Sequence, residues 1–152
     1  MIISQSRELE SFLRSIFLDS HRYRSLIVCS PFISPVQFRR LIAPSGRLPV
    51  DTVVLTRPES AVDLKTASRK WKGETLGVFS IPELHAKVYL ALGKHENDSV
   101  AFVGSWNLTT AGLSKLIELG LRICSNDIKH KKQIRKLELF LIKLTKEQRG
   151  AN

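Results

Sequence analysis

The chain has 152 residues, a length that favours one domain, residues 1–152, with its own hydrophobic core. Apolar residues make up 43% of it and charged residues 25%, a composition that excludes a disordered chain. Lys and Arg outnumber Asp and Glu by 24 to 14, which gives a net charge of +10. This excess favours a polyanionic partner, with nucleic acid ahead of an anionic membrane surface.

The first half of the chain is predicted to alternate helices and strands. Apolar residues at helical spacing predict a first helix, with Ser4 or Ser6 as its N-cap. The run "SLIVCS" predicts a buried strand that ends at Pro31, and a second helix begins near Pro35, since proline suits a first turn. The strand "VDTVVLT" and a helix through "SAVDLKTASRKW" follow. The helical spacing is that of Leu9, Phe12, Leu13, Ile16 and Phe17.

In the second half, strand follows strand. Residues 85–92 and 99–103 are predicted as two strands, joined by the polar turn "GKHEND". The short helical turn "TTAGLSK" precedes a strand over residues 117–124, and a basic helix covers about residues 127–146. This order implies a mixed β-sheet flanked by helices on both faces, an α/β sandwich.

The cysteines and the N-terminus predict a protein of the reducing cytoplasm. Cys29 and Cys124 lie in strand-like apolar runs, where free thiols are expected, and their spacing matches no zinc pattern. The start "MIISQSRELE" lacks the features of a signal peptide. No apolar run approaches the roughly 20 residues that a membrane span needs.

Four polar side chains fall at the ends of two apolar strands. His85 and Lys87 are two residues apart, so in a strand they share one face. Ser105 and Asn107 have the same spacing where the second strand ends. If the strands are neighbours, these groups converge as a set that suits a phosphodiester, with a nucleophile, a fixed cation and two neutral donors. Each residue alone has a plainer structural role, but together they favour a site.

The pattern His85-x-Lys87 followed by Gly104-Ser105-x-Asn107 resembles the HxK…GSxN signature of the phospholipase D superfamily. The continuation "NLTTAGL" and Glu118, eleven residues after Asn107, also resemble the family. The resemblance covers about residues 81–123. It implies the α-β-α sandwich of that family, to which the order of the preceding elements also conforms.

One motif position departs from the family. The full signature has an aspartate five residues after the lysine, where this chain has Leu92. A predicted hairpin, "GKHENDS", also lengthens the stretch before Gly104. In the family that aspartate looks structural rather than phosphate-binding, yet Leu92 leaves a degenerate, inactive copy as an alternative.

The resemblance implies a mechanism that needs two histidines. Family enzymes use two copies of the motif and this chain has one, so a twofold homodimer that joins two copies of His85 is implied, as in the small bacterial endonucleases of the superfamily. One His85 would form a phosphohistidine while its twin acts as general acid. Lys87, Ser105 and Asn107 would hold the phosphate, and Glu118 would orient an imidazole. Neither a cofactor nor a metal is implied.

Basic segments along the chain favour nucleic acid, and DNA first, as the phosphodiester substrate. Trp106 occupies the variable motif position and could stack on a base, although core or dimer packing is an equal alternative. The other candidate nucleic-acid-binding residues are Arg69, Lys70, Lys72, Lys129, Lys131 and Lys132.

The prediction is thus a metal-independent nuclease of low sequence specificity that works as a homodimer. One alternative is a phospholipase or other phosphodiesterase that acts on anionic lipid. Another is a non-catalytic nucleic-acid-binding module of the same fold. A role within a larger restriction or repair assembly, and the choice between DNA and RNA or between single and double strands, stay open at this point.

Overall fold

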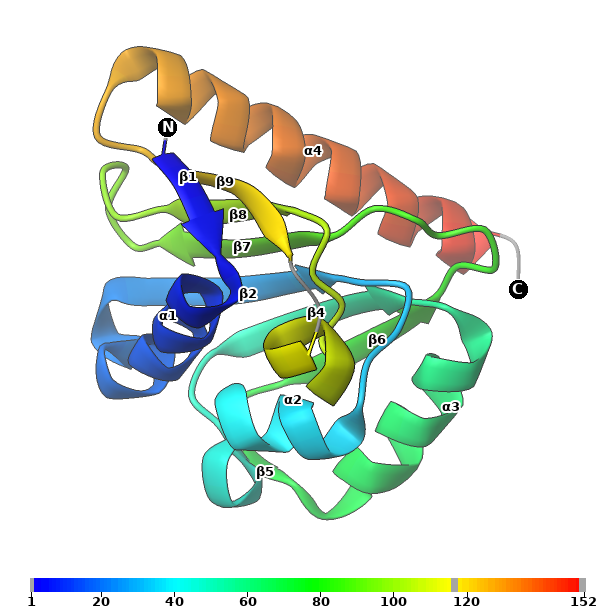
Figure 1. Ribbon diagram of the computed structural model, residues 1–152. Helices are drawn as coiled ribbons and strands as arrows, with labels where there is room; N and C mark the ends of the chain where they lie inside the picture. Colours follow the sequence, from blue (N-terminus) through cyan, green and yellow to red (C-terminus); the bar gives the residue numbers. More distant parts are fainter. Residues whose placement is uncertain (1, 116–117, 151–152) are drawn as a thin grey trace.

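A seven-stranded mixed β-sheet lies at the centre of the computed structural model, which describes residues 2–115 and 118–150 (Figure 1). The parallel pairs are those that β4 makes with β2 and with β6, and the other neighbouring strands are antiparallel. The strand order across the sheet is β1 (Ile2–Gln5), β9 (Leu119–Cys124), β8 (Val100–Gly104), β7 (Val88–Gly93), β2 (Tyr23–Cys29), β4 (Asp51–Thr56) and β6 (Leu76–Ser80). A small second sheet pairs β3 (Arg47–Leu48) with β5 (Lys72–Gly73).

Helices cover both faces of the large sheet, as the sequence predicts. In Figure 1, α1 (Ser6–Leu18), α2 (Pro35–Leu41) and α3 (Pro58–Ala67) lie on one side, and α4 (Ile128–Gly150) lies on the other. Successive side chains along a strand point to opposite faces of the sheet, so β2 contributes side chains to two hydrophobic cores. Leu26 and Val28 join the core beneath the first three helices, whereas Ile27 and Cys29 join the core beneath α4. The predicted α/β sandwich is confirmed.

Some element boundaries differ from those predicted. The strand expected over residues 85–92 begins at Val88, so His85 and Lys87 lie in the irregular segment before it. The helix expected to end near residue 146 continues to Gly150. The third helix ends at Ala67 and is followed by a 3-10 turn, Ser68–Lys70. Residue 117, the expected start of the last strand, lies outside the described residues, and β9 begins at Leu119.

The N-terminal strand β1 was not predicted. Its four residues pair with β9, more than a hundred positions away in the chain, so no local pattern announces the strand. The N-cap of α1 is Gln5 rather than Ser4 or Ser6. The Glu8 carboxylate accepts hydrogen bonds from the Gln5 backbone N–H and from the Ser4 hydroxyl, and so satisfies a donor at the start of the helix.

Candidate active site

The motif residues come from segments that meet at one edge of the sheet. His85 and Lys87 precede β7, Ser105 and Asn107 follow β8, and Glu118 precedes β9. Because β8 is antiparallel to both neighbours, its end lies beside the beginnings of β7 and β9. The Gly104 backbone N–H donates to the Lys87 carbonyl at 3.2 Å, so the HxK and GSxN segments are direct neighbours.

Hydrogen bonds join the GSxN segment to the start of β9. The Ser105 hydroxyl donates to the Glu118 carboxylate, and it accepts from the Leu119 backbone N–H at 3.2 Å. Within the part of the chain that the structure describes, no hydrogen bond links Glu118 to His85. The expected role of Glu118 in orienting an imidazole therefore stays a prediction, while its contact with Ser105 fixes the hydroxyl.

Two side chains contact backbone carbonyls of the HxK segment. The Lys87 ammonium donates to the His85 carbonyl at 3.0 Å, and the Cys29 thiol lies 3.7 Å from the Ala86 carbonyl. Burial raises the pKa of Cys29 to about 12, against a smaller opposing effect of the Lys87 charge, so this thiol stays protonated. Cys29 and Cys124 are both free, as predicted.

Sequence reasoning missed a buried hydroxyl layer beneath the GSxN segment. The Tyr89 hydroxyl donates to the Trp106 carbonyl at 3.0 Å, and Tyr89 is fully buried. Burial raises its pKa well above the ordinary value, so Tyr89 is a neutral donor. The Ser30 hydroxyl lies 3.4 Å from the Asn107 side-chain oxygen and donates to the Phe32 carbonyl at 2.9 Å. A lone hydroxyl in the apolar run "VYLAL", two residues after Lys87, was the available signal for Tyr89.

Arg57, at the end of β4, is a second residue that the sequence did not single out. Its guanidinium donates from Nε to the Leu84 carbonyl at 3.0 Å, directly before His85. The same group lies 5.0 Å from the centre of the Phe32 ring, a cation–π distance. Arg57 therefore ties the HxK segment to the ends of β2 and β4.

The structure corrects the prediction that Trp106 stacks on a base. Trp106 is fully buried, and its ring meets Phe102 edge-on with ring centres 6.2 Å apart. Gly104 and Gly120 are paired across β8 and β9, and a methyl group on either would overlap the indole. The alternative of core packing is confirmed, and the two glycines make room for it.

Gly120→Ala is expected to lower the free energy of unfolding by about 1–3 kcal/mol, because the new methyl overpacks a filled site. The displaced indole lies between Ser105 and Asn107 in sequence, so activity should fall as well. Thermal unfolding followed by circular dichroism measures the effect. Gly150→Ala is the matched control, since no atom lies within 4 Å of the added methyl, and equal melting temperatures for the two variants would contradict the overpacking account.

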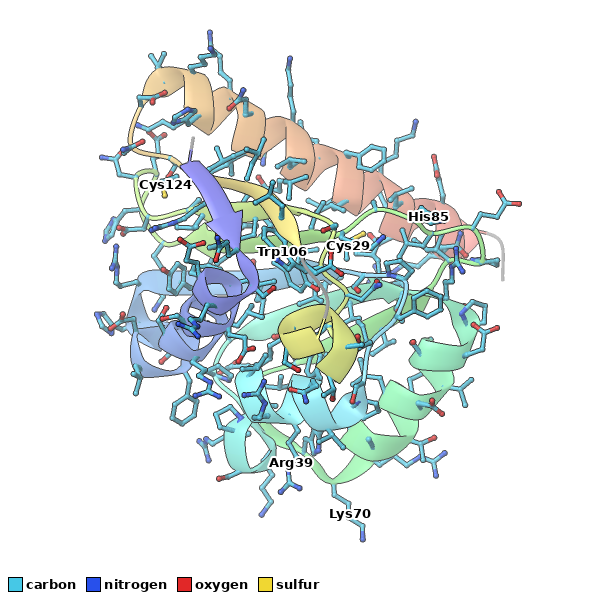
Figure 2. The ribbon with its side chains drawn as sticks, viewed as in Figure 1. Cys29, Arg39, Lys70, His85, Trp106 and Cys124 are labelled. Carbon is cyan, nitrogen blue, oxygen red and sulfur yellow. The ribbon has the colours of Figure 1, made fainter. Side chains whose placement is uncertain are left out.

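The predicted nucleic-acid-binding cations do not gather around the motif. Lys131, near the start of α4, pairs with Glu96 in the turn between β7 and β8, at the end of β7 away from His85. Figure 2 shows Lys70 at the lower edge of the molecule and His85 at its right. Arg69 precedes Lys70 in the same 3-10 turn and Lys72 lies in β5, whereas Lys129 and Lys132 share the start of α4.

Two structural features are absent from the described residues. No three His, Cys, Asp or Glu side chains there come together in a way that could hold a metal ion. No helix in those residues combines the length and apolar character of a membrane span.

The fold is shared with solved structures. NucT from Helicobacter pylori superposes with a TM-score of 0.67 at 14% sequence identity, over 95% of this chain and 94% of that one. Nuc from Salmonella typhimurium, a phospholipase D family member, superposes with a TM-score of 0.54 at 18% sequence identity, over 89% of this chain and 88% of that one. A mutant of yeast tyrosyl-DNA phosphodiesterase 1 gives 0.52 at 13% identity, over 80% of this chain but 31% of that larger one.

Sequence comparison alone does not reach these proteins, since no family model and no curated protein matches the chain. The likeness is one of structure, and it extends over nearly the full length of NucT and Nuc. The chain therefore has the phospholipase D fold, as its HxK…GSxN motif predicts.

Proposed function

We propose that this protein is a metal-independent phosphodiester hydrolase, a nuclease whose favoured substrate is DNA. The observation that carries the proposal is the meeting of the HxK and GSxN segments at one edge of a phospholipase D fold, through the bond from Gly104 to Lys87. The net charge of +10 favours a nucleic-acid substrate. The two free cysteines favour a reducing compartment, and we place the protein in the cytoplasm on that ground.

The proposed reaction has two steps. In the first, an imidazole nitrogen of His85 attacks phosphorus, a P–N bond forms and the P–O bond to the leaving strand breaks. The His85 of a second subunit, protonated at the start, gives its proton to the leaving oxygen. Lys87, Ser105 and Asn107 hold the non-bridging oxygens and offset their charge.

In the second step, water attacks the phosphohistidine. The same second imidazole, now neutral, takes a proton from the water as the P–N bond breaks. This returns both histidines to their starting states and leaves a phosphate end on one strand. The bond from Ser105 to Glu118 holds the serine hydroxyl beside the phosphate position, and in this scheme the hydroxyl turns its one proton from the carboxylate to a non-bridging oxygen when substrate binds.

The homodimer belongs to the same proposal. A single chain supplies one motif histidine, and His85 is solvent-exposed, so a second copy can reach it. Large apolar side chains are also exposed around the motif segments, as is usual for a surface that another protein covers. They are Phe32 (47% exposed), Val36 (73%) and Leu119 (55%).

The test is cleavage of plasmid, single-stranded DNA, RNA and anionic lipid vesicles in excess EDTA. We expect cleavage of DNA, with little turnover of vesicles. Faster lipid turnover would support the phospholipase alternative instead. DNA that is bound but never cleaved would support the non-catalytic binding module.

A further inference from the structure

A cavity lined by both charged and apolar side chains lies at the end of β7 opposite to His85. Its volume is about 360 Å³, within the range of small-ligand sites. It is bounded by the starts of β2 and α4, the turn between β7 and β8, and the end of β9. The side chains that argue for a ligand are Arg24, Lys94, Ser99, Ser125, Lys131 and Arg135.

A buried carboxylate holds two arginines together on one side of this cavity. Glu138 of α4 accepts from Arg24 at 2.9 Å and from Arg135 at 2.6 Å. Its side chain is 7% exposed, whereas those of Arg24 and Arg135 are 54% and 62% exposed. Each guanidinium has five N–H donors, so each keeps donors for a ligand after binding Glu138. The Glu138 carboxylate therefore offsets the repulsion between the Arg24 and Arg135 guanidinium groups and holds both of them at the cavity.

Two buried hydroxyls lie in the wall of the cavity. Ser99 accepts from the Gly93 backbone N–H and Ser125 accepts from the Ser99 backbone N–H, each at 3.0 Å. The two serines are 8% and 1% exposed. Within the described residues neither hydroxyl donates to an acceptor, so both protons are available to an anion that enters.

The charge of the cavity is positive. Four Lys or Arg side chains line it against two Glu, which leaves a net of +2 with His95 neutral. Lys131 is paired with Glu96, but Glu96 is 88% exposed, and such pairs are weak. Arginine forks, lysines and hydroxyl donors together are the groups that bind a tetrahedral phosphate oxyanion.

We propose that this cavity binds a backbone phosphate of the nucleic acid, at a distance from the bond that is cleaved. The proposal rests on the proposed function for its choice of substrate. The six residues of β7 separate the cavity from the HxK segment by about 20 Å at roughly 3.4 Å per residue. A helical strand advances about 3.4 Å per nucleotide, so the two sites lie about six nucleotides apart. The cavity thus adds affinity only for strands long enough to reach both sites.

The experiment compares two variants of equal charge. Lys94→Ala/Lys131→Ala removes two cations from the cavity, and Lys136→Ala/Lys143→Ala removes two exposed cations of α4 that do not line it. Binding of labelled single strands of about 2 and about 16 nucleotides is measured at low and moderate salt, since even a fully extended dinucleotide is too short to reach both sites. The measurements use the His85→Ala background, so that binding is read without cleavage. Arg135→Lys, which keeps the charge but loses the fork, is the second cavity variant.

We expect the cavity variant to bind the long strand about tenfold more weakly, with a salt slope smaller by about 1–2. Binding of the short strand and hydrolysis of bis(p-nitrophenyl) phosphate, measured with His85 intact, should not change. Equal losses in the cavity and control variants would overturn the proposal. A second pair of results would also overturn it. Inorganic phosphate would raise the melting temperature of the wild type but not of the cavity variants, while the variants would bind the long strand as tightly as the wild type.

The two proposals can fail separately. If the wild type does not cleave DNA but its affinity depends on strand length and on the cavity residues, the nuclease proposal is rejected and the phosphate site is kept. If the wild type cleaves DNA and the cavity substitutions do not change its affinity for long strands, the phosphate site is rejected and the nuclease proposal is kept.

Discussion

His85→Ala is expected to lower the rate of DNA cleavage by about 1,000-fold or more, because the variant loses both the nucleophile and the general acid. His85 is exposed and its side chain makes no hydrogen bond within the described residues, so the fold should survive the change. Cleavage in EDTA by wild type and variant, prepared identically, measures the loss. His21→Ala is the matched control, since this exposed histidine lies in the 3-10 turn Ser20–Arg22 before β2, outside both the motif and the proposed phosphate cavity.

A mixture of the two proteins tests the second half of the mechanism. If each active dimer needs two copies of His85, activity after subunit exchange should follow the square of the wild-type fraction. An equal mixture then keeps about one quarter of the activity of the same total of wild type. A loss in direct proportion, to about one half, would show that each subunit acts on its own. Residual cleavage by a pure His85→Ala preparation would remove His85 from the mechanism altogether.

The sequence was sufficient for those parts of the molecule that local patterns determine. Apolar spacing located α1, the apolar runs located β2 and β4, and the polar turn after β7 placed the two motif segments on neighbouring antiparallel strands. In each case the information lies within about twenty residues of chain. The order of helices and strands then specified the α/β sandwich.

The rest depends on contacts between distant segments. Strand β1 exists because β9 offers it a free edge, and Trp106 is buried because Gly104 and Gly120 leave space for its ring. Ser30 and Arg57 reach the motif from the ends of β2 and β4. No spacing within the chain reports such contacts, so these supporting residues could not be named in advance.

Leu92, the position where the family signature has aspartate, is explained by its place on β7. Side chains alternate along this strand, and Val88, Leu90 and Leu92 join the core beneath α4, whereas Tyr89 and Ala91 join the other core. Position 92 is also near the far end of the strand from His85. A side chain there cannot contact a phosphate held by Lys87, so Leu92 removes no group from the proposed site.

Leu92→Asp, which recreates the family motif, is therefore expected to destabilise the protein and to leave activity per folded molecule no higher. Leu92 is 4% exposed and belongs to the buried cluster that contains the α4 side chains Ile134 and Leu141. An aspartate would lose this apolar contact and place a third carboxylate at the cavity that Glu96 and Glu138 line. We expect a loss of about 3 kcal/mol or more in the free energy of unfolding, and of about 10 °C in melting temperature.

Two further substitutions separate the causes of that loss. Leu92→Met keeps the volume and should cost less than about 1.5 kcal/mol, whereas Leu92→Asn loses the apolar contact without adding charge and should fall between the other two. Urea unfolding of all three variants gives the free energies, and cleavage at a temperature where each is folded gives the activities. If Leu92→Asp were as stable as Leu92→Met and cleaved DNA faster than the wild type, this chain would be an impaired copy of the motif. With the order Met, Asn, Asp in stability and no gain in activity, the leucine is instead part of the core that seats α4, and a carboxylate at this position is unnecessary for the proposed reaction.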